Sequence, residues 1–364
     1  MTTQNITQEQ RTLYLTKMNV AVRKYLKENN ISRFGGREIL NKFFIFAFAT
    51  AVLYTCILVF PEINKYIRNV IFYGGIGLNF AFIGFTVMHD ASHGTFSENK
   101  NLNQLMLHTL EIMGASSILW IIKHVDIHHN KTNTVDDDDL NSWPVLRLHS
   151  SDTPLWFHKY QHFYGPVVYC LLFIIWIYVN DYVKYFRMQI KNRKIKTEEI
   201  KLKDHIVFWA GKIIHPTIFI VVPSFYIGIE NALIGYFGFL CTICGFSISF
   251  IFQLAHVVES TEEIGETEIE KAYSFMERQI RTTSNFSTGN KWVTFFTGGL
   301  NFQIEHHLFA HISHVHYPKI QHIVQEYVKL AELEYKELTI LNAFVSHEIE
   351  LKDLGTRKQT LLVK

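Results

Sequence analysis

The amino-acid sequence predicts an all-α integral membrane protein with about four transmembrane helices and additional re-entrant or interfacial helices. Of its 364 residues, 48% are hydrophobic and 15% are aromatic, a content that a lipid-facing surface would explain. Five long apolar runs contain no charged residue, at 43–60, 70–88, 163–179, 213–229 and 232–255. Each run approaches the roughly 20 residues that an α-helix needs to cross the hydrocarbon core of a bilayer.

A sixth apolar stretch, residues 102–122, differs from the others because Gln104, His108 and Glu111 interrupt it. Polar and ionisable side chains are costly against lipid at the middle of a bilayer. We therefore expect this stretch to form a re-entrant or interfacial helix, in which His108 is a polar anchor.

Basic residues predict the orientation of the helices. Eight Lys or Arg precede residue 43, and eight more lie between the third and fourth apolar runs, namely Lys184, Arg187, Lys191, Arg193, Lys194, Lys196, Lys201 and Lys203. Cytoplasmic loops carry such an excess, so both regions are expected on the cytoplasmic side. The run 163–179 must then lie in or dip into the inner leaflet, which leaves four crossings and places the polar regions on one side.

Composition excludes several other classes of protein. A formal net charge of +2 is too small to indicate nucleic-acid binding. The four cysteines lie inside apolar stretches, where neither a disulfide framework nor a redox motif is expected: Cys56, Cys170, Cys241 and Cys244. No glycine-rich phosphate loop or serine nucleophile motif occurs, and the polar start of the chain predicts no cleavable signal peptide.

The nineteen histidines carry the clearest chemical signal, because several form groups beside the ends of the apolar runs. The groups are His89 and His93; His124, His128 and His129; His306 and His307, which follow Gln303 by about one turn; and His256 at the end of the last run. Histidines four residues apart share one face of a helix. A single one of them could be a structural anchor, but together they predict metal binding. Imidazole suits iron, zinc, copper and nickel, and eight histidines exceed the four ligands of one zinc ion, so two metals fit better.

These motifs resemble the three histidine boxes of the membrane fatty-acid desaturase family, which match HDASH at 89–93, HVDIHH at 124–129 and QIEHH at 303–307. The resemblance runs from about residue 43 to about residue 318, and includes GGLNFQIEHHLF at 298–309 and His-Tyr-Pro at 316–318. It divides the chain into a cytoplasmic N-terminal arm (1–42), a membrane desaturase domain (43–318) and a cytoplasmic C-terminal helical tail (319–364).

The resemblance implies a histidine-rich cytoplasmic cap that holds a di-iron centre. Its implied ligands are His89, His93, His124, His128, His129, His306 and His307, while His256 is similar to an extra ligand found at the end of the last span in family members. Gln303 takes the place of a ligand histidine, either as a weak ligand or by holding a water. Asp90, Asp126 and Glu305 adjoin the ligands, and they are either hydrogen-bond acceptors for the imidazoles or ordinary interfacial charges.

The resemblance further implies an O2-dependent desaturase that introduces a cis double bond into a fatty acyl-CoA or acyl-lipid. A glutamine at the start of the third box is similar to the front-end branch, which works on the carboxyl side of an existing double bond. Residues 1–42 lack the haem-binding His-Pro-Gly-Gly of a fused cytochrome b5 domain, so electrons are expected from a separate cytochrome b5 or ferredoxin. The expected location is a bacterial inner membrane, or the endoplasmic reticulum in a eukaryote, with the active site on the cytoplasmic face.

The sequence leaves alternative functions and alternative roles for some residues open. Histidine clusters also occur in hydroxylases and ketolases of the same superfamily, and a histidine-rich metal transporter would instead place its ligands near the middle of the bilayer. The acidic run Asp136–Asp139 is either a solvated loop or a contact with a metal ligand or a partner. The histidines beyond the third box are expected to lie outside the ligand set: His311, His314, His316 and His322.

Overall fold

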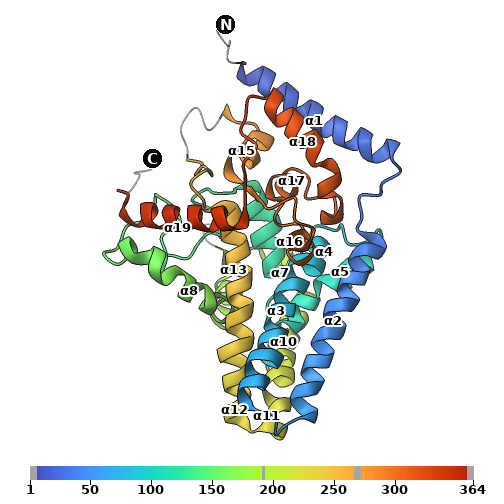
Figure 1. Ribbon diagram of the computed structural model, residues 1–364, viewed down its shortest axis with the longest axis vertical. Helices are drawn as coiled ribbons and strands as arrows, with labels where there is room; N and C mark the ends of the chain where they lie inside the picture. The colour runs from blue at the N-terminus through green and yellow to red at the C-terminus, as the bar shows by residue number, and fades with distance from the viewer. Residues whose placement is uncertain (1–5, 191–192, 266–271, 359–364) are drawn as a thin grey trace. The chain divides into compact units, whose positions relative to one another are not determined.

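A computed structural model describes residues 6–190, 193–265 and 272–358 (Figure 1). In these ranges the regular secondary structure is helical apart from two pairs of two-residue strands: β1 (Gln189–Ile190) is antiparallel to β2 (Arg193–Lys194), and β3 (Asn285–Phe286) is parallel to β4 (Glu337–Leu338). The predicted all-α class is confirmed. Lys191 of the basic connector and residues 359–364 of the tail lie outside the described residues.

Contacts between residues divide the chain into two compact units. Unit 1 comprises Met1–Gly35, Ile127–Phe163 and Phe252–Lys364, and unit 2 comprises Gly36–Asp126 and Tyr164–Ile251. Each unit therefore combines segments that are distant in the sequence. The division into 1–42, 43–318 and 319–364 rests on motifs and chain order, and it stays a prediction.

Five helical runs are long and apolar enough to cross a membrane: Gly36–Val59, Ile67–Ser92, His158–Arg187, Leu202–Ile227 and Ile229–His256. Each covers most or all of one apolar run of the sequence, as expected for an integral membrane protein. The length of the third helix allows it to cross or to lie in one leaflet, so the expectation for 163–179 stays a prediction.

The runs consist of α-helices joined without a break to π-helical or 3-10 turns. The first run is α2 (Gly36–Val59); the second is η1 (Ile67–Tyr73), α3 (Gly74–Ile83), η2 (Gly84–Met88) and α4 (His89–Ser92); the third is η5 (His158–Tyr160), α8 (Gln161–Ile175), η6 (Trp176–Asn180) and α9 (Asp181–Arg187); the fourth is α10 (Leu202–Pro216), η8 (Thr217–Val221) and α11 (Val222–Ile227); the fifth is α12 (Ile229–Gly235), η9 (Tyr236–Cys241) and α13 (Thr242–His256). Close approach between α3 and η9 requires a glycine, because a Cβ at Gly77 would lie 2.2 Å from the carbonyl oxygen of Leu240.

The sixth apolar stretch is broken into two helical segments. The first contains α5 (Lys100–Leu107) and α6 (Thr109–Ile112); the second contains α7 (Ser117–Trp120), η3 (Ile121–Ile127) and η4 (His128–Asn130); and the two are bent by 106°. A bend of this size is typical of a re-entrant loop or a broken span, and it agrees with the interruption that the polar residues of this stretch predicted.

Side chains of unit 2 bond the backbone groups that this break leaves without helical partners. The ammonium group of Lys212 donates to the carbonyl oxygen of Gly114 at 2.7 Å, and the carboxylate of Asp181 accepts from the backbone N–H of Ser116 at 3.0 Å. Lys212 and Asp181 are both buried and form an ion pair at 2.7 Å. Because an unsatisfied backbone group inside a membrane costs several kcal/mol, this pair stabilises the bend.

Unit 1 has its own hydrophobic core, in which α1 (Gln8–Glu28) and α18 (Tyr317–Leu330) lie side by side (Figure 1). The apolar face of α1 repeats every three or four residues, as an amphipathic helix requires: Leu15, Met18, Val22 and Leu26 are all buried. The other elements of unit 1 are α15 (Phe275–Thr282), α16 (Lys291–Phe296), α17 (Gln303–Leu308), η10 (His314–His316) and α19 (Ile340–Thr356). The short α17 carries the third histidine motif into this core, which holds its side chains in place.

Candidate metal centre

Three histidines from three separate segments of unit 1 meet in the structure. His128 lies in η4, His256 ends α13 and His307 lies in α17, and all three side chains are buried. Each can offer one ring nitrogen to a group whose members all lie within 4.8 Å of one another. Nitrogen ligands at about 2.1 Å from one metal ion lie roughly 3 to 4 Å apart, so the group is of the size that one ion needs.

Gln303 lies beside the same group. Its side-chain amide is 2.8 Å from Nε2 of His256 and 3.3 Å from Nε2 of His307. An amide carries both a donor and an acceptor, so rotation of this group by half a turn presents its oxygen to the same point. The glutamine therefore lies beside two candidate ligand histidines, and its role in place of a ligand histidine stays a prediction.

The remaining two candidate ligand histidines of unit 1 pack directly against this group. The ring of His129 stacks on that of His307, with ring centroids 4.5 Å apart, and meets His306 edge-on at 4.6 Å. Nδ1 of His306 lies 3.1 Å from the hydroxyl group of Tyr317 in α18. Unit 1 thus brings together all five of its candidate ligand histidines.

Two polar residues orient the rings of unit 1 from the outside. His128 donates from Nδ1 to the carboxylate of Asp137 at 2.9 Å, and both side chains are fully buried. His307 donates from Nδ1 to the amide oxygen of Gln279 at 2.8 Å. A bond of this kind fixes the tautomer with its proton on Nδ1, so that Nε2 carries the lone pair that binds a metal.

The sequence indicated one of these two orienting residues but not the other. Asp137 belongs to the acidic run 136–139, and its bond to His128 supports the second of the two alternatives for that run. Gln279 was not identified from the sequence. It lies in α15, which is distant along the chain from every histidine motif, and no local pattern marks it.

Three carboxylates adjoin candidate ligands in the sequence, and their role as hydrogen-bond acceptors for the imidazoles stays a prediction. Glu305 is buried and accepts from the amide of Asn285 at 2.8 Å and from the hydroxyl of Tyr335 at 2.7 Å, and burial raises its pKa to about 7. Asp126 is half-exposed, 3.9 Å from Arg193. Asp90 is buried in α4, where it attracts Lys42.

The other three candidate ligands lie close together within unit 2. Nε2 of His89 lies 3.0 Å from Nε2 of His124, and the ring of His93 is 4.9 Å from that of His89 and 5.5 Å from that of His124. Two nitrogen ligands bound at right angles to one metal at about 2.1 Å would be about 3 Å apart. Trp120 stacks on His124 with ring centroids 4.5 Å apart and supports the position of this ring.

The donor chemistry of both groups fits iron. The candidate ligands are imidazole nitrogens and one amide, and Asp137 and Gln279 accept hydrogen bonds from two of the rings. Imidazole suits iron as well as zinc and copper. Of the histidines beyond the third motif, His316 lies 3.1 Å from the carbonyl oxygen of Phe34 and His322 meets the ring of Tyr25 edge-on. Their place outside the ligand set stays a prediction.

Comparison with known proteins supports a specific chemistry for these groups. A family model described as fatty acid desaturase matches residues 69–339, which include all three histidine motifs and His256. The chain is 31% identical over 346 residues to an acyl-lipid (8-3)-desaturase of Physcomitrium patens, covering 92% of this chain and 70% of the relative. It is 27% identical over 354 residues to an sn-1 linoleoyl-lipid 6-desaturase of Arthrospira platensis, covering 96% and 94%, and 30% identical over 284 residues to an sn-1 linoleoyl-lipid 6-desaturase of Synechocystis sp., covering 74% and 76%.

Proposed function

This chain belongs to the fatty acid desaturase family, and we propose that it introduces a cis double bond into the acyl chain of a membrane lipid, on the carboxyl side of an existing double bond. The observation that carries this proposal is the conjunction of a glutamine-led third histidine motif with relatives whose names describe acyl-lipid desaturases. Those names favour an acyl-lipid over an acyl-CoA as the substrate. Desaturation rather than oxygen insertion follows from the same relatives.

The five histidines of unit 1 and the three of unit 2 supply the ligands of two irons in this proposal: His128, His129, His256, His306 and His307, with His89, His93 and His124. Support comes from the spacing of the ring nitrogens within each unit and from the family to which the chain belongs. When bound, the irons would supply the activation of O2, which takes two hydrogens from the acyl chain and is reduced to two molecules of water with two added electrons and two protons.

The protein residues orient the ligands rather than act as acids or bases on the substrate. An aliphatic C–H bond offers no proton that a side chain could remove at ordinary pH, so no catalytic base is assigned. Asp137 and Gln279 hold two imidazoles in the tautomer whose Nε2 faces the ion. Gln303 completes the set as a weak amide ligand or by holding a water, and its contacts with His256 and His307 support this role.

Electrons come from a separate carrier, a cytochrome b5 or a ferredoxin, on the cytoplasmic side. The basic residues between 184 and 203 offer a surface for an acidic carrier, because opposite charge steers association. The exposed members of this set include Lys194, Lys196, Lys201 and Lys203.

Lipid analysis of a host that expresses the chain tests the reaction. Cells fed linoleate or stearate separately are extracted, and the double bonds are located by gas chromatography and mass spectrometry of dimethyl-disulfide adducts. We expect a new cis bond on the carboxyl side of an existing bond in linoleate, and none in cells that express His307→Ala. New bonds only on the methyl side, or hydroxylated products without an alkene, would contradict the front-end assignment.

A further inference from the structure

The C-terminal helix α19 is fastened to the residues where the apolar helix His158–Arg187 begins. The side-chain amide of Gln161, the first residue of α8, donates to the carbonyl oxygen of Leu351 in α19 at 2.7 Å. Gly355 lies so close to η5 that a Cβ there would be 2.1 Å from the carbonyl oxygen of His158. Both contacts join backbone to the first turn of this apolar helix, so α19 lies beside the point where that helix begins.

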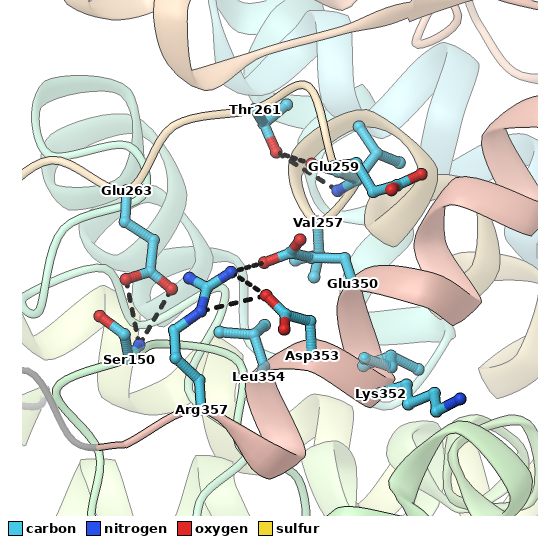
Figure 2. Close-up of polar contacts among 12 residues, drawn as sticks. Ser150, Val257, Glu259, Thr261, Glu263, Glu350, Lys352, Asp353, Leu354 and Arg357 are labelled. Carbon is cyan, nitrogen blue, oxygen red and sulfur yellow. Dashed lines mark hydrogen bonds and ion pairs between the residues drawn. The ribbon is translucent and has the colours of Figure 1, made fainter.

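Buried polar groups lock the end of α19 in this position. The guanidinium group of Arg147 is fully buried and donates to the carbonyl oxygens of Leu354 and Arg357, which end α19. Cations near the last carbonyls of a helix also interact favourably with its dipole. Figure 2 shows Arg357 between Glu350 and Asp353, with Lys352 pointing away from this group.

The inner face of α19 contacts the chain just after a candidate iron ligand. His347 is fully buried and donates from Nδ1 to the carbonyl oxygen of Val257 at 2.7 Å. The hydroxyl of Ser346 accepts from the backbone N–H of Glu259 at 2.9 Å. These two bonds fix which face of α19 points into unit 1.

The opposite face of α19 carries a line of aliphatic side chains that unit 1 leaves exposed. Leu341, Val345 and Ile349 follow at intervals of four residues, so they lie along one side of the helix, and they are 67%, 48% and 45% exposed. Lys352, one turn further along, is also exposed. A helix with one buried face and one exposed apolar line needs a further apolar surface to cover that line.

Large exposed aromatic side chains lie beside the residues that hold α19. Trp156 and Phe163 are 79% and 75% exposed at the start of the apolar helix, and Tyr160 lies between them. The ammonium group of Lys159 lies over the ring of Tyr160 at 4.9 Å. Tryptophan and tyrosine gather at membrane–water interfaces, where lysine extends its charge toward the headgroups.

We propose that α19 is an in-plane helix of the membrane interface, with Leu341, Val345 and Ile349 immersed in the lipid at the level marked by Trp156 and Phe163. The apolar face of such a helix enters the boundary between headgroups and acyl chains by about 5 to 10 Å. Three aliphatic side chains offer far less than the roughly 800 Å² per partner of a stable protein interface, whereas a bilayer continuous with the neighbouring apolar helix covers them without a partner. This inference does not depend on iron or on desaturation.

Site-directed labelling tests the proposal in the full chain, reconstituted in phospholipid vesicles. The half-buried Cys56 and Cys170 are first replaced by alanine, and an environment-sensitive fluorophore is attached to Val345→Cys or Ile349→Cys. Leu330→Cys on α18 is the matched control, because Leu330 is an aliphatic residue of unit 1 with a similar exposure of 43%. These positions are exposed, so labelling leaves the core of unit 1 intact.

We expect vesicles made with brominated phospholipids to quench the labels at 345 and 349 at least twofold more than the label at 330, and aqueous iodide to show the reverse order. Labels at 345 and 349 that respond like the label at 330 would overturn the proposal. Protection of both labels from lipid and from iodide would mean that a protein covers α19, and would overturn it as well.

Discussion

Replacement of Asp137 by asparagine isolates the effect of one buried charge on the candidate iron site. Both carboxylate oxygens of Asp137 accept from Nδ1 of His128, and each also accepts one backbone N–H at 3.0 Å, from Asn133 and from Asp139 respectively. Asparagine has the same shape but carries an NH2 group in place of one oxygen. The variant therefore loses the negative charge, and its NH2 group faces one of the two backbone N–H groups without being able to accept from it.

Two free energies follow from this geometry. A hydrogen bond to a charged group contributes about 1.5–3 kcal/mol and a neutral one about 0.5–1.5 kcal/mol. The hydrogen bond that orients the His128 ring should therefore become weaker by roughly 1–2 kcal/mol. Since about 1.4 kcal/mol corresponds to a tenfold change in an equilibrium constant, iron affinity should fall about 5- to 30-fold. The unsatisfied backbone N–H should separately lower the free energy of unfolding by about 1–3 kcal/mol.

Iron titration of the purified protein, with metal content measured by mass spectrometry, checks the first value, and thermal unfolding in detergent checks the second. The matched control is Asp136→Asn in the same acidic run, because Asp136 is partly exposed and forms an ion pair with the exposed Lys131. A surface pair of this kind contributes about 0–1 kcal/mol. Wild-type iron affinity in Asp137→Asn, or an equal loss in Asp136→Asn, would refute the reasoning.

Four further predictions follow from the candidate site and its surroundings. His307→Ala should abolish desaturation and deplete bound iron without preventing membrane insertion, as measured by metal analysis of the membrane fraction; full activity would refute its role as a ligand. Gln303→His should retain both irons and Gln303→Ile should weaken one site, which iron counts per chain distinguish. Burial lowers the pKa of His347 to about 4, so the unfolded state binds more protons than the folded state between about pH 6.5 and pH 4. Stability should therefore fall as the pH drops through this window, and His347→Gln should flatten that dependence in thermal melts. Cysteines at the exposed positions Val145 and Lys194 should react with an impermeant reagent only in inside-out vesicles, and labelling in sealed cells would contradict the predicted topology.

The membrane helices and the histidine groups could be predicted from the sequence because their signals are local. An uncharged run of about 20 residues identifies an apolar helix by itself. The interruption of 102–122 by Gln104, His108 and Glu111 likewise predicted a re-entrant or interfacial helix, and the bend in this stretch is compatible with a re-entrant loop. Histidines four residues apart share a helix face wherever that helix lies.

The residues that orient those histidines depended on the tertiary structure. Gln279 reaches His307 from another helix. The same holds for the contact that stabilises the bend, because Lys212 reaches the backbone of Gly114 from a span about a hundred residues further along the chain. Such partners obey no spacing rule, because they are chosen by how the elements pack and not by the periodicity of one element. Asp137 shows how far the sequence could lead. The acidic run to which it belongs was compatible with a solvated loop and with a contact to a candidate ligand, and the burial of its carboxylate against His128 supports the contact.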